Sequence, residues 1–186
     1  MTWTDHWRPF TSKDAETYTS AREGETKIGQ RVQCADAGIV ESLEASDARY
    51  VLLGIPEDIG VRANGGRPGA AYGWKATLPH FMNVQSNEYL DGKEVLVLGT
   101  LDTDEWMEAS QGATVERLRE LTSEIDEAVW PLIQKIAALG KIPMVIGGGH
   151  NNSYGCLRGV SQALGRPIHC VNIDPHADFR AAEGRH

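Results

Sequence analysis

The chain has 186 residues, a formal net charge of −8 at pH 7, 41% hydrophobic residues and 24% charged residues. This length allows one large domain or two small ones with a sizeable core. The acidic balance and scattered basic residues argue against nucleic acid or an anionic membrane as partner, and no apolar run approaches the ~18 residues of a membrane span.

Residues 1–48 are polar and weakly patterned, so we expect an N-terminal extension that wraps over a domain formed by residues 49–186. Four short apolar runs then predict strands, at residues 49–56, 94–100, 141–149 and 167–174. Nearly continuous apolar strands are typical of a parallel sheet that is covered on both faces.

Two segments between these runs predict helices, at residues 113–139 and about 152–164. Apolar residues recur every three or four positions along the first segment, as on one stripe of a helix. Gly140 suits the left-handed position after its end, and Pro131 predicts a kink or a break into two helices. The alternation of strands and helices predicts an α/β fold, a three-layer α/β/α arrangement with a mainly parallel sheet.

The three cysteines, Cys34, Cys156 and Cys170, form no CxxC or zinc pattern. Cys156 and Cys170 lie in apolar sequence, and we expect both to be buried. An odd number of unpatterned cysteines indicates a reducing compartment, and the N-terminus has no apolar segment of a secretory signal. We therefore expect a cytoplasmic protein.

Two unusual polar segments follow the third and fourth predicted strands: "GGGHNNSYG" (147–155) and "DPHADFR" (174–180). Parallel strands bring their carboxyl ends to one edge of the sheet, where ligands bind. Asp174, His176 and Asp178 alternate, so in an extended chain they point to one side. They suit Mn²⁺ or Fe²⁺, with Zn²⁺ or Co²⁺ as alternatives. The spacing alone also fits a strand that runs into a solvated loop.

His150 follows three glycines and is predicted beside that triplet, which strengthens the metal interpretation. Other chemistries are disfavoured. A GxGxxG loop that starts at Gly147 would need glycine at position 152, which is Asn152. Ser153 has no G-x-S-x-G elbow around it.

"GIPEDIGVRANGGRPGAAYG", "GGGHNNSYG" and "NIDPHADFR" resemble three ordered motifs of the arginase/agmatinase/formimidoylglutamase (ureohydrolase) family. The resemblance runs over about residues 49–186. It implies an arginase-like α/β/α fold, two Mn²⁺ ions and hydrolysis of amidine or guanidine C–N bonds. Family members commonly form oligomers, which implies a possible homo-oligomer.

The resemblance also implies roles for individual residues. His150 and Asp178 would hold one metal, His176 the other, and Asp174 would bridge both. A metal-bridging hydroxide would attack the amidine carbon, with Asp178 as the catalytic residue that helps to move its proton. Asn151, Arg180 and His186 are assigned to substrate binding.

Three positions depart from the arginase pattern. Gly149 stands where arginases usually have Asp, Pro175 replaces the commoner Ala, and Arg180 stands where arginases carry Asn. The GGGH form and Arg180 look more like formimidoylglutamases, and a guanidinium can clamp a substrate carboxylate. We therefore expect conversion of formimidoylglutamate to glutamate and formamide, a step of histidine catabolism. Hydrolysis of arginine, agmatine or a guanidino acid is the alternative.

The family's third motif, which supplies two more aspartates to the metals, has no counterpart after Asp178. Asp174, Asp178 and a hydroxide would leave two Mn²⁺ under-neutralised. We therefore expect one ion, or weak binding, in this chain, which looks truncated. An inactive truncated relative remains a further alternative.

Overall fold

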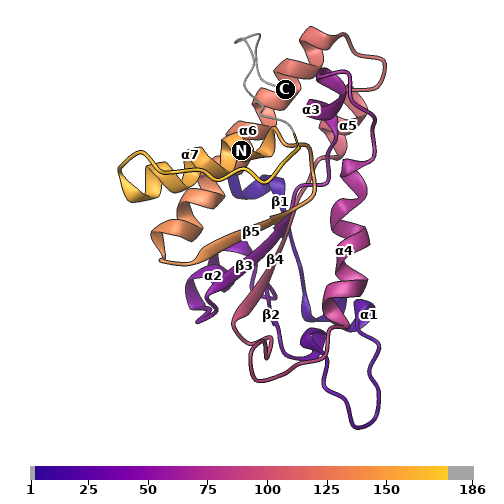
Figure 1. Cartoon of the computed structure of the whole chain (residues 1–186), viewed down its shortest axis with the longest axis vertical. Helices are drawn as coiled ribbons and strands as arrows, with labels where there is room; N and C mark the ends of the chain where they lie inside the picture. Colours follow the sequence, from indigo (N-terminus) through magenta and orange to yellow (C-terminus); the bar gives the residue numbers. More distant parts are fainter. Residues whose placement is uncertain (1–2, 176–186) are drawn as a thin grey trace.

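The computed structural model of the chain describes residues 3–175, and within them a five-stranded sheet lies between two layers of helices (Figure 1). The strands are β1 (Trp7–Pro9), β2 (Gln33–Cys34), β3 (Tyr50–Gly54), β4 (Val95–Leu101) and β5 (Ile142–Ile146). Their order is β1-β4-β3-β5, and β2 also pairs with β4. Only β1 is antiparallel to its neighbour. The predicted mainly parallel sheet is confirmed.

Seven α-helices and three short 3₁₀ helices accompany these strands in the described part of the chain. They are η1 (Trp3–His6), α1 (Ser12–Tyr18), η2 (Ile28–Gln30), α2 (Ile39–Ala45), α3 (Ile59–Ala63), η3 (Ala70–Tyr72), α4 (Gly73–Met82), α5 (Asp104–Ala109), α6 (Val115–Ala138) and α7 (Asn152–Leu164).

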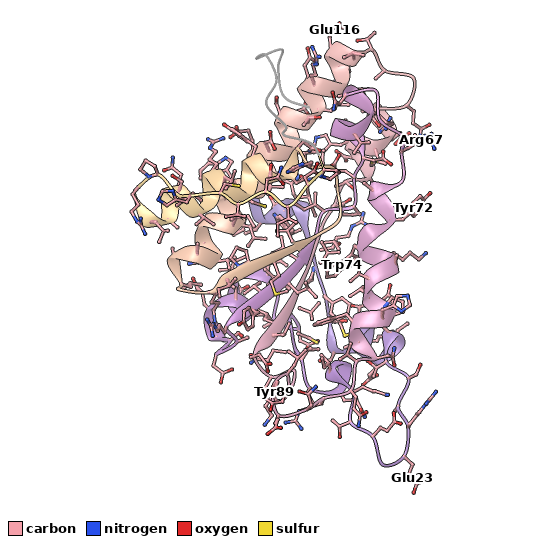
Figure 2. All side chains as sticks on the ribbon, in the orientation of Figure 1. Glu23, Arg67, Tyr72, Trp74, Tyr89 and Glu116 are labelled. Atoms are coloured by element: carbon pink, nitrogen blue, oxygen red, sulfur yellow. The ribbon has the colours of Figure 1, made fainter. Side chains whose placement is uncertain are left out.

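Successive residues of β3 enter two different cores, because side chains alternate across a sheet. Val51 and Leu53 pack with buried residues of α2, α3 and α6. Leu52 packs with Trp74 of α4 and with residues of α1 on the opposite face. Trp74 points from α4 toward the sheet, whereas Tyr72 points away and is 72% exposed (Figure 2). The three-layer α/β/α prediction is therefore confirmed.

Helix α6 is the longest helix described and supplies much of one core. The predicted apolar stripe is buried along its middle and exposed only at its ends, Val115 and Leu139. Pro131 lies inside the helix, so the predicted break is wrong. Val129 and Leu132 are fully buried on either side of it, and this packing holds both halves in one helix. No helix within residues 3–175, α6 included, is both long and apolar enough to span a membrane.

The end of α6 forms as predicted. Gly140 has φ of 74°, a left-handed conformation that glycine adopts without strain. Its N–H donates to Ala137 O at 3.0 Å, and that of Lys141 donates to Ile136 O at 3.2 Å. This pair of bonds satisfies carbonyls that the end of a helix would otherwise leave without partners.

The N-terminal segment is part of the same sheet. Pro9 pairs with Gly99, and Cys34 pairs with Val97. Strands β1 and β2 therefore pair with the same edge of β4, opposite the edge that pairs with β3. Trp7 and Phe10 are each only 5% exposed and belong to opposite cores. The boundary at residues 48 and 49 stays a prediction, but residues 3–48 contribute both strands and core.

The fourth predicted strand, residues 167–174, is wrong. This segment has no strand in the structure, and Val171 and Ile173 are 86% and 97% exposed. It runs back along α7, where Ile168 and Cys170 line a hollow of about 340 Å³ with four α7 residues. Within residues 3–175, β5 is the edge of the sheet and pairs with β3 alone, so this segment adds no strand to it. For the same reason Cys170 is exposed, against expectation.

Candidate functional site

The carboxyl ends of β3 and β5 lie side by side, because the two strands pair in parallel and their last residues, Gly54 and Ile146, face each other. The loop after β3 therefore meets the loop after β5. Gly147 and Gly148 have φ of 82° and 79°, in the left-handed region. These two glycines turn the chain from β5 directly toward α7.

Glu57 joins the two loops. Its side chain is completely buried. One carboxylate oxygen, Oε2, accepts from Ile59 N at 2.6 Å and from Gly60 N at 3.4 Å. The other, Oε1, accepts from Gly149 N at 2.9 Å, Asn152 Nδ2 at 2.6 Å and Asn151 Nδ2 at 3.3 Å. One carboxylate thus ties the start of α3 to the start of α7.

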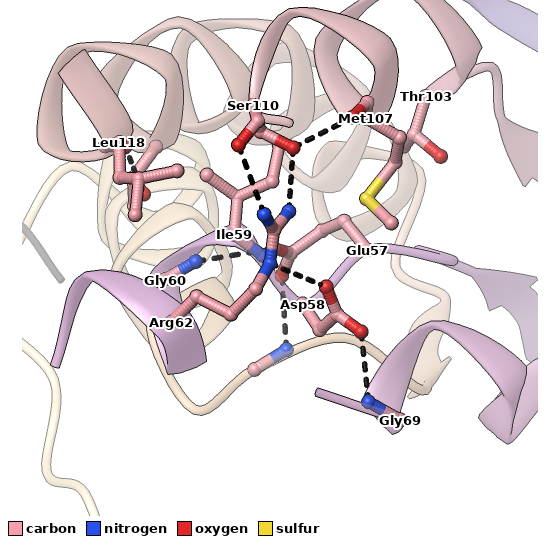
Figure 3. Close-up of polar contacts among 12 residues, drawn as sticks. Glu57, Asp58, Ile59, Gly60, Arg62, Gly69, Thr103, Met107, Ser110 and Leu118 are labelled. Carbon is pink, nitrogen blue, oxygen red and sulfur yellow. Dashed lines mark hydrogen bonds and ion pairs between the residues drawn. The ribbon is translucent and has the colours of Figure 1, made fainter. Parts of the chain in front are cut away.

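The next residue, Asp58, secures the far side of the same loop. Its Oδ1 accepts from Arg62 Nε at 3.0 Å and its Oδ2 from Gly69 N at 2.8 Å. Arg62 in turn donates to Ser110 O at 3.1 Å and to Ser110 Oγ at 2.5 Å (Figure 3). Asp58 and Ser110 are buried, so the loop between β3 and α4 is held to the end of α5.

His150 and Asp174 lie close together although the predicted fourth strand is missing. His150 Nδ1 and Asp174 Oδ2 are 3.9 Å apart, with side chains 52% and 28% exposed. This separation exceeds a hydrogen bond. Two ligand atoms that each bind the same metal ion at about 2.0–2.2 Å can lie no more than about 4.4 Å apart. The imidazole and the carboxylate are therefore close enough for one cation to contact both, although adjacent ligands of a tetrahedral or octahedral ion lie nearer, at roughly 3.0–3.6 Å.

The other predicted site residues fall into two groups. His176, Asp178, Arg180 and His186 lie outside the described residues. Asn151 is described, and its amide donates to Glu57 while its Oδ1 is buried without a hydrogen bond in the structure. Within residues 3–175 there is no group of three or more His, Cys, Asp or Glu side chains that could hold a metal. The proposed roles of all these residues stay predictions.

Sequence reasoning missed Glu57 as the residue that connects the loops. The signal was an acidic pair, Glu57 and Asp58, between apolar residues directly after a buried strand. A carboxylate placed there must find donors or face a large desolvation cost. The glycine-rich segment after β5 offered such donors, so a partnership between the two loops could have been anticipated.

The chain is similar to known proteins over most of its length. The model of the arginase family matches residues 48–186. A formimidoylglutamase of Klebsiella pneumoniae (strain 342) is 35% identical over 134 residues, which cover 71% of this chain and 37% of that protein. A formimidoylglutamase of Geobacillus sp. (strain WCH70) is 29% identical over 94% of this chain and 50% of that protein. The chain thus spans half or less of these relatives.

Among solved structures, a Trypanosoma cruzi formiminoglutamase crystallised with Mn²⁺ is similar to this chain. The sequence identity is 23% and the TM-score 0.44, with 75% of this chain and 41% of that chain covered. The family model covers well over half of the chain, and the Klebsiella relative exceeds 30% identity over more than two thirds of it. The chain belongs to the arginase family.

Proposed function

We propose that the protein is a metal-dependent hydrolase of linear amidine C–N bonds, with formimidoylglutamate as its substrate and Mn²⁺ as its metal. The observation that carries this proposal is the approach of His150 Nδ1 to Asp174 Oδ2, at 3.9 Å, with His150 in a turn that donates hydrogen bonds to the buried Glu57. Two residues 24 positions apart meet where the sequence predicts metal ligands.

His150 and Asp174 would hold the metal from the carboxyl end of β5, together with His176 and Asp178. When bound, the metal supplies the Lewis acidity that activates water at neutral pH. Asp178 would take up the proton of that water and pass it to the leaving nitrogen. Arg180 would hold the distal carboxylate of the substrate.

The choice of formimidoylglutamate has two supports. The curated relatives described above are named formimidoylglutamases. The sequence also departs from the arginase pattern at Gly149, in the GGGH segment, and at Arg180. Both departures resemble formimidoylglutamases. Formimidoylglutamate carries two carboxylates, so a guanidinium can bind the one distant from the amidine, whereas arginine has a single carboxylate and agmatine has none.

The test compares metal binding and turnover in the wild-type protein and a His150→Asn variant. We expect formamide release from N-formimidoyl-L-glutamate only with added Mn²⁺. Loss of one imidazole ligand should weaken Mn²⁺ binding at least about tenfold and lower turnover with it. His80→Asn, at an exposed position of α4, is the matched control and should change neither.

Two results would count against the proposal. No hydrolysis of formimidoylglutamate, arginine, agmatine or guanidino acids by the protein with Mn²⁺ would remove the enzymatic function. Equal Mn²⁺ affinity in the wild type and His150→Asn would remove His150 from the metal site. Hydrolysis of arginine but not of formimidoylglutamate would retain the reaction class and correct the substrate.

A further inference from the structure

We infer that Glu57 is a positioning residue for the metal site: its carboxylate fixes the turn Gly149–Asn152 and thereby the place of His150. This inference rests on the proposed function, because it concerns the affinity of the site for Mn²⁺. Glu57 is 0% exposed, so it acts through other residues and not by contact with substrate.

The hydrogen bonds that Glu57 accepts are divided between two loops. Two of the donors to Glu57 lie in its own loop, at Ile59 and Gly60. Three lie in the turn after β5, at Gly149, Asn151 and Asn152. His150 is therefore flanked on both sides by residues that donate to a single buried carboxylate. The side chain of His150 itself is about half exposed, at 52%.

All five donors to Glu57 are neutral N–H groups, so its side chain acts only as an acceptor. A carboxylate accepts at both oxygens, whereas a glutamine of the same shape carries an NH₂ group in place of one of them. That NH₂ group would face N–H donors of one of the two loops. A buried donor that loses its acceptor is unfavourable, so that loop would have to move.

The turn after β5 is closely packed at Gly148 and Gly149. A Cβ at Gly148 would lie 2.2 Å from Asn152 Nδ2 and 3.0 Å from Glu57 Oε1. A Cβ at Gly149 would lie 2.2 Å from Asn151 Oδ1. The backbone therefore lies directly against the amide groups that Glu57 holds, and a shift of those amides displaces the backbone on both sides of His150.

The test measures Mn²⁺ affinity from the electron paramagnetic resonance signal of free Mn²⁺ in wild type, Glu57→Gln and Asn152→Ala. We expect Glu57→Gln to weaken binding about 10- to 100-fold, the usual effect of residues that support metal ligands. Asn152→Ala removes one donor but keeps the carboxylate, so its loss should be smaller. This second variant also serves if Glu57→Gln does not fold.

Asp58→Asn is the matched control. Asp58 is the adjacent residue and is also buried, at 4% exposure. Its carboxylate accepts hydrogen bonds from Arg62 and Gly69, and not from the turn after β5 that Glu57 holds. We expect it to change Mn²⁺ affinity less than about threefold, even where it lowers the melting temperature as much as Glu57→Gln. If Glu57 only stabilised the fold, Glu57→Gln and Asp58→Asn would have similar Mn²⁺ affinities, and the inference would be overturned.

Amide hydrogen exchange without metal separates this inference from the proposed function. We expect faster exchange of the Gly149 amide in Glu57→Gln, and wild-type exchange there in Asp58→Asn. Unchanged exchange, or unchanged Mn²⁺ affinity in a folded Glu57→Gln, would overturn the inference. A wild-type protein that binds no Mn²⁺ would overturn the proposed function and the metal part of this inference, while exchange still decides whether Glu57 fixes the turn.

Discussion

Gly149 illustrates how a single residue depends on a partner distant in sequence. Arginases usually carry Asp at this position, and here a Cβ would lie 2.2 Å from Asn151 Oδ1 and 2.9 Å from Val61 Cγ2. The buried carboxylate beside the Gly149 amide comes from Glu57, at 2.9 Å. With this carboxylate supplied from the loop after β3, position 149 has neither room nor need for an acidic side chain.

The three cysteines differ in environment, and this predicts their reactivity. Burial, with the Asp36 carboxylate, raises the pKa of Cys34 to about 11, and burial, with Asp126, raises that of Cys156 to about 11. The thiolate is the reactive form, and only about 10⁻³ of such a thiol is ionised at pH 8. Cys170 is exposed.

We therefore expect iodoacetamide to modify Cys170 first at pH 7–8. Because their pKa values are raised, Cys34 and Cys156 should react about tenfold faster for each unit of pH increase up to about 11. Peptide mass spectrometry of the protein at several pH values measures each rate. Modification of Cys156 at the rate of Cys170 at pH 7 would contradict the raised pKa of the Cys156 thiol.

At the scale of elements, α6 and α7 pack through two glycines. A Cβ at Gly155 would lie 2.9 Å from Val129 Cγ1, and one at Gly159 would lie 2.7 Å from Trp130 O and from Ile133 Cβ. Glycines four residues apart lie on one face of a helix. This face brings the start of α7, and with it the turn that carries His150, close against α6.

Gly159→Ala is therefore expected to destabilise the protein. Alanine favours the helix by about 1 kcal/mol over glycine, but the added methyl group meets a backbone carbonyl and requires α7 to move. Overpacking of this kind costs about 1–3 kcal/mol, so the net change in unfolding free energy should be a loss.

Urea unfolding of Gly159→Ala against Gln162→Ala, which is exposed on the same helix, measures this effect. The control should stay within about 0.5 kcal/mol of wild type. A more stable Gly159→Ala would show that helix propensity outweighs the contact and that the two helices are not closely packed.

The elements also show which parts of the fold the sequence could predict. The predicted helix at 152–164 matches α7, Asn152–Leu164, because its apolar period and following glycine are strong local signals. Strands β1 and β2 were missed, since three and two residues are too short to show a pattern. The apolar run 167–174 predicts a strand that is absent, because a sequence pattern does not show whether the edge of the sheet accepts another strand.

The candidate site could be predicted in part for the same reason. Residue type and position at the ends of apolar runs point to His150 and Asp174, and these two lie 3.9 Å apart. The role of Glu57 depends on contacts with Gly149 and Asn152, more than 90 positions away. Such a partnership follows from the pairing of β3 with β5 and leaves little trace in local sequence.

For the whole molecule, the N-terminal segment completes both cores. Trp7, Phe10, Ile28, Ile39 and Leu43 are all 6% exposed or less. Burial of five such side chains contributes about 7–15 kcal/mol. This is comparable to the entire stability of a typical domain, about 5–15 kcal/mol.

A chain that begins at residue 49 should therefore fail to fold on its own. We expect it to be insoluble, or to lose cooperative melting in circular dichroism. Arg8→Ala is the control within β1, because its ion pairs with Asp102 and Asp104 are exposed and contribute about 0–1 kcal/mol. Cooperative melting of residues 49–186 near the wild-type temperature would show that the extension is dispensable.

The antiparallel pairing of β1 with β4 also affects synthesis of the protein. Trp7 pairs with Leu101, so β1 has no partner until roughly 90 further residues have been translated. At about 5–20 residues per second, this takes on the order of 5–20 s. Until β4 is made, Trp7 and Phe10 lack much of the core that buries them, so we expect this segment to be bound by chaperones that recognise apolar sequences at the ribosome.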